Sequence, residues 1–148
     1  MTTNLPRWLV RALPKRGRWH ILRAAALVGI NTDGTKVMLG QLIVDDVQTA
    51  MAISIRFTSS QYHRLERWGR DACMVSKAAI LRTAIFIGLG LPDGRTGNCV
   101  KPEGWPQRLR KSVWKKIVAE SGIRRMPNFA GDTEQPMYVH LGNDNMYW

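Results

Sequence analysis

Cysteine, acidic residues and long apolar runs are all scarce in this chain of 148 residues. Its two cysteines, Cys73 and Cys99, are too few for a disulfide framework and lack the spacing of a metal motif. No apolar run reaches the roughly 20 residues that cross a bilayer, and no N-terminal segment has the regions of a secretory signal. We therefore expect a cytoplasmic protein that does not enter a membrane.

Residues with catalytic or metal-binding chemistry are also few. The histidines His20, His63 and His140 are scattered, and no His-x-x-x-His or Cys-x-x-Cys spacing occurs. The glycine-rich segment 88–94 follows a helical pattern instead of joining a strand to a helix, which favours a helix end and loop over a phosphate cradle. We predict a protein that is not an enzyme and that holds neither a metal nor a cofactor.

Positive charge is abundant. The chain has 22 lysines and arginines against 11 acids, a formal net charge of +11, and the first acid is Asp33. An excess of this size favours a polyanion such as nucleic acid as partner. The alternative is a basic protein whose surface charges are only solvated. Hydrophobic residues make up 45% of the chain, which is typical of a folded protein and not of a disordered one.

Residues 1–23 are expected to form a basic N-terminal arm. Arginine interleaved with Trp8 and Trp19 suits contact with phosphates and bases, and we assign Arg16 and Arg18 to DNA phosphates. Equally, the two tryptophans would anchor the arm onto the core.

Residues 24–50 are interpreted as a β-hairpin extension. Two apolar runs flank Asp33-Gly34, and an Asp-Gly pair supplies the positive φ of a tight turn. We expect residues 24–47 to have a packing role, or to contact a further protein partner.

Residues 92–148 are predicted to contain a loop, a basic helix and an irregular tail. Pro106 suits the first position of a helix over 106–120, on whose basic side we assign Lys111 and Lys115 to DNA phosphates. The alternative is a packed amphipathic helix whose charged side chains are only solvated. The tail, 123–148, is mostly irregular with a short strand over Met137–Leu141, and is the other candidate for protein contact.

Residues 51–91 point most directly to a function. Apolar and polar residues alternate from Ala52 to Phe57, which predicts a strand with one apolar and one polar side. The polar side carries Ala52, Ser54 and Arg56. Arginine can bind guanine O6 and N7, and serine can bond to a base edge, so these side chains suit the major groove. An ordinary half-buried strand would show the same alternation.

Two helices are predicted to follow this strand. Thr58 and Gln61 are spaced for a capping box, and Ser76 is placed to cap the second helix. The second helix is apolar nearly all round and must be buried. Within a forty-residue unit only a second copy could bury it, so we predict an intertwined homodimer. The expected dimer core is Ile53, Ile55, Phe57, Leu65, Ile80, Ala84 and Ile87.

Three segments of this unit match a known pattern: Ile53-Ser54-Ile55-Arg56-Phe57, Tyr62-His63-Arg64-Leu65-Glu66-Arg67, and Ser76-Lys77-Ala78-Ala79-Ile80-Leu81-Arg82-Thr83-Ala84. The unit resembles the ribbon–helix–helix family, the class of the Met and Arc repressors. The resemblance implies an α+β fold with one strand and two helices per chain in an intertwined dimer. It also implies that Ala52, Ser54 and Arg56 contact bases.

The resemblance further implies that Val75, Ser76 and Lys77 hold the DNA backbone. Helix physics supports this assignment independently, since a helix N-terminus has open amides and the positive end of the dipole. One departure is that Ala72-Cys73-Met74 occupies the turn between the helices, where the family usually has a glycine.

These observations predict a sequence-specific, double-stranded DNA-binding protein that acts as a homodimeric transcriptional repressor. An alternative is an accessory DNA-binding factor in a plasmid or phage complex, such as a relaxosome or partition complex. A further alternative is a non-enzymatic nucleic-acid-binding subunit of a larger assembly.

Overall fold

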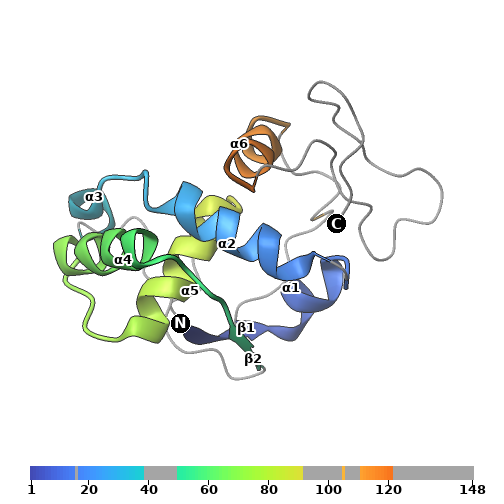
Figure 1. The fold of residues 1–148 in the computed structure, drawn as a ribbon, viewed down its shortest axis with the longest axis horizontal. Coiled ribbons are helices and arrows are strands. Elements are labelled where there is room, and N and C mark those ends of the chain that lie inside the picture. The colour runs from blue at the N-terminus through green and yellow to red at the C-terminus, as the bar shows by residue number, and fades with distance from the viewer. Residues whose placement is uncertain (16, 39–49, 92–104, 106–110, 122–148) are drawn as a thin grey trace.

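The computed structural model describes residues 1–15, 17–38, 50–91, 105 and 111–121. It is an α+β fold in which the described helices pack together and a two-stranded antiparallel sheet lies along one side of them (Figure 1). The elements, in chain order, are β1 (Thr2–Pro6), α1 (Arg7–Ala12), α2 (Arg18–Gly29), α3 (Gly34–Met38), β2 (Ala50–Ser54), α4 (Ser59–Asp71), α5 (Lys77–Gly88) and α6 (Lys111–Ser121).

The centre of the core is the contact between α2 and α5. The two backbones approach so closely that a Cβ on Gly29 would overlap the carbonyl of Ala84, and a Cβ on Gly88 would overlap the carbonyl of Ala25. Glycine at both crossing points permits this approach. The inference that only a second copy could bury α5 is therefore wrong, because α2 of the same chain covers it.

The β-hairpin predicted from residue 24 onward is also wrong over its described part. Residues 18–29 form α2, and the run Ala24-Ala25-Ala26 within it is fully buried. Alanine is the strongest helix former, and a helix buried on most sides shows no apolar stripe that would identify it. The apolar run was therefore equally compatible with a strand or a buried helix.

The Asp-Gly pair begins a helix instead of making a hairpin turn. The side chain of Asp33 accepts hydrogen bonds from the backbone amide of Thr35 at 3.0 Å and from its hydroxyl at 2.8 Å. These bonds lower the pKa of Asp33 below its ordinary value. An aspartate that binds an amide two residues on is typical of a helix start, and α3 begins at Gly34.

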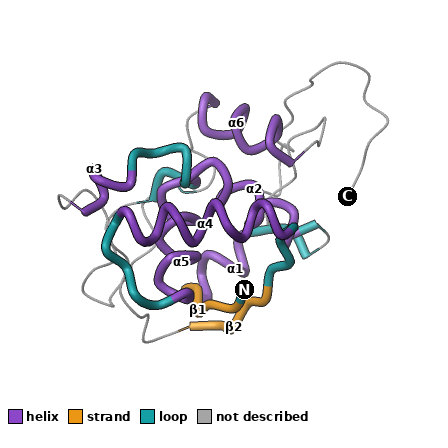
Figure 2. Tube along the Cα trace, turned by 60° about the vertical axis from the view of Figure 1, so that its left-hand side comes forward, coloured by secondary structure: helices purple, strands orange, loops and turns teal. Residues whose placement is uncertain are grey.

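The predicted strand–helix–helix order of residues 51–91 is confirmed, although the strand lies earlier than expected. It spans Ala50–Ser54, and Arg56 and Phe57 follow its end. Its partner is β1 of the same chain, in a register that pairs Thr2 with Ser54 and Asn4 with Ala52. The name ribbon is used below for this β1–β2 pair, which lies at the edge of the helical core (Figure 2).

Both predicted helix caps of this unit are present. The hydroxyl of Thr58 accepts a bond from the amide of Gln61 at 3.2 Å, and the Gln61 side chain accepts one from the amide of Thr58 at 3.0 Å. Ser76 caps α5 by accepting a bond from the amide of Ala79 at 3.3 Å. In the turn between the helices, Cys73 has the positive φ of 58° that a glycine would adopt most easily.

Residues 1–23 do not extend from the core as an arm, because most of their described apolar residues are buried or partly buried in it. Leu5 and Leu9 are fully buried, and Trp8 packs edge-on against Trp105 with ring centroids 5.4 Å apart. Trp19, by contrast, is 46% exposed. The alternative that both tryptophans anchor this segment therefore holds for Trp8 and not for Trp19.

The basic helix near the C-terminus is confirmed over Lys111–Ser121. It packs against α2, whereas strand β1 of the ribbon packs against α5. Figures 1 and 2 both show α6 and the ribbon on opposite sides of the helical core. Residues 39–49 of the predicted hairpin and the predicted tail 123–148, with its strand Met137–Leu141, lie outside the described residues.

Candidate nucleic-acid interface

The polar side of β2 is exposed, as the alternation of the sequence predicts. Ala52, Ser54 and Arg56 are exposed, while Ile55 between them is 1% exposed. Strand geometry explains the split, because successive side chains point to opposite faces. The three residues assigned to base contact therefore reach solvent from one side of the chain, with Arg56 just beyond the end of the strand.

The residues predicted as a dimer core lie in the core of the single chain. Leu65, Ile80 and Ala84 are buried, and Ile53 and Ile87 are partly buried against them. Phe57 is likewise partly buried. Their burial within one chain does not need the second copy on which the dimer was argued. The homodimer itself stays a prediction.

The start of α5 lies beside the ribbon. An open hollow of about 480 Å³ separates the two, and its lining includes Thr2, Asn4, Ser76 and Arg82. The amides of Lys77 and Ala78 are in the first turn of α5, where helix geometry provides no carbonyl for them within the helix. Amides and dipole together favour an anion at this end.

Arg82 brings a second positive group to the same hollow. Its side chain is 4% exposed, and its Nη1 donates a hydrogen bond to the hydroxyl of Thr3 at 3.2 Å. That hydroxyl donates in turn to the carbonyl of Ala78 at 2.7 Å. The chain of bonds ties β1 to the first turn of α5, so the ribbon and the helix start are held in one arrangement.

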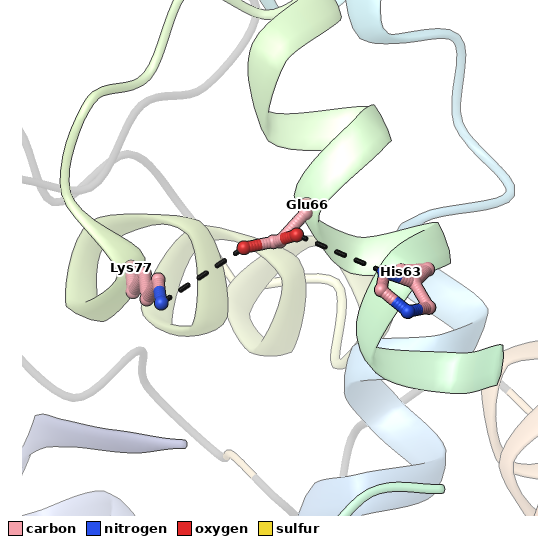
Figure 3. A network of polar contacts seen from close by, with 3 residues as sticks. All are labelled: His63, Glu66 and Lys77. Carbon is pink, nitrogen blue, oxygen red and sulfur yellow. Dashed lines mark ion pairs between the residues drawn. The ribbon is translucent and has the colours of Figure 1, made fainter. Parts of the chain in front are cut away.

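Lys77 is held by α4. Its Nζ lies 3.9 Å from Oε1 of Glu66 (Figure 3). The same Nζ lies 5.3 Å from the ring centre of Tyr62. A hydrogen bond with the Tyr62 side chain, together with the charge of Glu66, raises the pKa of Lys77 above its ordinary value. The ammonium group stays exposed, so a phosphate at α5 would compete with Glu66 for it. Val75, two residues before Lys77, is fully exposed.

The other predicted phosphate contacts belong to the N-terminal segment and to α6. Arg18, at the start of α2, donates from Nη2 to the carbonyl of Leu13 at 3.2 Å. Lys115 is exposed on α6, on the far side of the core from the ribbon. Lys111 begins α6, but its side chain lies outside the described part of the chain, as does Arg16.

Two exposed polar residues of the ribbon escaped the sequence analysis. Thr2 and Asn4 lie on the same face as Ser54 and Ala52, because each is paired with one of them. The sequence signal that could have identified them is the alternation along Thr2–Leu5, in which Thr2 and Asn4 are exposed and Thr3 and Leu5 are buried. It was weak because Thr3, on the buried side, is itself polar.

Within the described residues, no three His, Cys, Asp or Glu side chains lie close enough together to hold a metal ion. Among those same residues, no helix has the length and apolar character needed to cross a membrane. Comparison of the chain with protein-family models, with curated proteins and with solved structures finds no match to any of them. The proposals below therefore depend on the site itself.

Proposed function

We propose that this protein is a sequence-specific, double-stranded DNA-binding protein that occupies operators and represses transcription. The observation that supports it most is the exposed polar face of the ribbon, whose strand β1 borders the positive start of α5. A strand pair fits the major groove, where Arg56 would bind guanine and Ser54 would bond to a base edge.

The start of α5 would hold the adjacent DNA backbone. Ala78 of its first turn and the buried Arg82 line the hollow that borders the ribbon, and the ammonium of Lys77 is exposed on the same first turn, beside α4. Phosphate contacts fix position and orientation, while base contacts determine which sequence is bound. The two kinds of contact are therefore adjacent, as groove binding requires.

A binding experiment tests the base and phosphate assignments separately. DNA that the chain selects from a random pool would serve in mobility-shift titrations with Arg56→Ala, Ser54→Ala and Lys77→Gln. The first two variants should relax preference at individual base pairs, by about ten- to a hundredfold for the arginine. Lys77→Gln should weaken binding to all sequences alike and reduce the salt slope by about one.

Unchanged sequence preference in both Arg56→Ala and Ser54→Ala would count against base contact by β2. A wild-type chain that selects no sequence from the pool would contradict the function itself. The position of the selected site separates the biological roles: a promoter supports a repressor, and a transfer origin or partition site supports an accessory factor of a plasmid or phage.

Phosphate contact by α6 needs its own test, because α6 lies across the core from the ribbon. Lys115→Gln should reduce the salt slope by about one if the bound DNA reaches α6. It should leave the slope unchanged if the duplex stays on the ribbon side.

A further inference from the structure

The ribbon is closed within one chain, and its hydrogen-bonding pattern fixes which side chains come closest. The amine of Met1 donates to the carbonyl of Ile55 at 2.7 Å, and the amide of Ile55 donates to the carbonyl of Met1 at 2.8 Å. Residues that exchange both bonds form one kind of antiparallel pair, and the next pair along is the kind with closer side chains.

That next pair is Thr2 with Ser54, whose hydroxyl oxygens lie 2.7 Å apart. Two residues further along, Asn4 pairs with Ala52 in the same way and on the same face. All four residues are exposed, whereas Thr3 and Leu5 on the other face of β1 are buried. The exposed face of the ribbon is thus composed of small, uncharged side chains contributed equally by both strands.

A face of this composition is suited to contact base edges in the major groove of DNA. Neighbouring strands are about 4.8 Å apart, so the pair is narrow enough for the roughly 12 Å width of the major groove. Short side chains let the backbone approach the bases. An asparagine amide can both donate and accept, which matches N6 and N7 of adenine, and a hydroxyl can bond to either kind of base edge.

We propose that β1 is the second DNA-contacting strand, so that one chain carries a complete two-stranded ribbon and Thr2 and Asn4 contact base edges beside Ser54. This inference rests on the proposed DNA-binding function and adds two specificity residues and a stoichiometry to it. Because β1 takes the place that a twin strand from another chain would occupy, a single chain suffices for each ribbon inserted in the groove.

The experiment uses the full chain with Asn4→Ala and Thr2→Val, titrated against the DNA selected by the wild type and against every single-base variant of that site. Asn4→Ala should lose preference at one base pair, by about ten- to a hundredfold, with the other positions unchanged. Thr2→Val keeps the shape of the residue and removes its hydroxyl, and should relax a neighbouring position.

Asn31→Ala is the matched control, since Asn31 is exposed in the turn after α2 and does not line the hollow beside the ribbon. It should leave preference unchanged at every position. Thermal melts of all variants, and retained binding to non-specific DNA, show that a loss of preference is not a loss of folding.

Stoichiometry is measured on the same DNA by the mass of the complex, with the site trimmed to the shortest duplex that still binds. One chain of 16.8 kDa per minimal site is expected. Two outcomes would overturn the inference while the proposed function stands: full preference retained in both Asn4→Ala and Thr2→Val, or a minimal site that binds only two chains together. Failure of the wild type to prefer any sequence would instead remove the proposed function.

Discussion

Gly88 on α5 faces the carbonyl of Ala25 on α2 with no room between them for a side chain. The group that a Cβ would meet is backbone in a buried helix, so it cannot turn aside as the end of a side chain could. The same arrangement occurs between Gly29 and Ala84, which makes the contact of these two helices tolerant of glycine alone at both points.

Gly88→Ala should therefore destabilise the protein by at least about 3 kcal/mol, the upper part of the range for overpacked cores. Gly69→Ala is the matched control, because the atoms nearest to its added Cβ all belong to the side chain of Ile80 and not to backbone. It should cost less, since Ile80 has side-chain torsions with which to yield. Urea unfolding of both variants measures the difference, and equal losses would contradict the account of the helix crossing.

At Cys73 the backbone conformation favours glycine but the residue has a Cβ, since its φ is 58°. A left-handed conformation costs a residue with a Cβ about 1–2 kcal/mol, while glycine loses about 0.5–1 kcal/mol of additional backbone entropy on folding. Cys73→Gly should therefore stabilise the protein by about 0.5–1 kcal/mol. Cys73→Ala keeps the Cβ and serves as the control without that gain. A variant with glycine that is no more stable than the alanine variant would contradict the prediction.

His20 predicts a pH dependence of stability. Its ring stacks on Trp19 with centroids 3.5 Å apart, and burial together with the charge of Arg23 lowers its pKa from the ordinary value of 6.5. The unfolded chain therefore binds a proton more readily than the folded one. The stability contributed by neutral His20 is fully present above about pH 6.5 and is lost as the pH falls through its folded pKa.

Thermal unfolding between pH 7.5 and 4.5 should show a smaller decline in His20→Gln than in the wild type. Arg23→Gln is the companion variant, because removing its charge should move the pKa of His20 back toward 6.5, as measured by NMR titration of the ring. An identical decline with pH in the wild type and His20→Gln would contradict the prediction.

Glu66 is predicted to restrain DNA binding. It holds the ammonium of Lys77 at 3.9 Å, on the first residue of the helix that we propose meets a phosphate. Glu66→Gln should release Lys77 and tighten DNA binding by roughly two- to fivefold, the range expected for an exposed ion pair. Glu120→Gln makes the same change in net charge on α6. Equal tightening in both variants would show an effect of net charge alone.

The strand–helix–helix order and its caps were predictable because their signals are local. Alternation in 52–57 and the spacing of Thr58 and Gln61 involve residues within one turn or strand. The partners were not predictable, since nothing near Ser54 in the sequence indicates Thr2. Likewise, the alanines and leucines of α2 do not indicate which element covers them. Only the structure shows that this element is α5.

The sequence predicted which side of β2 is exposed, but not which segment provides the second strand of the ribbon. Alternation placed Ser54 and Arg56 outward, as the structure has them, but sequence reasoning supplied the second strand from another molecule. That step assumed that a forty-residue unit had only itself to pack against. The N-terminal residues supplied both the second strand and the covering helix.

Pairing Thr2 with Ser54, 52 positions further on, also determines when the ribbon can appear during synthesis. The first strand leaves the ribosome early and must wait until the whole segment through α3 and β2 has followed it. Contacts between such distant positions form late and slowly, because a long loop has to close first. A chain that ends before β2 would thus lack the ribbon, and with it the surface that we propose contacts DNA.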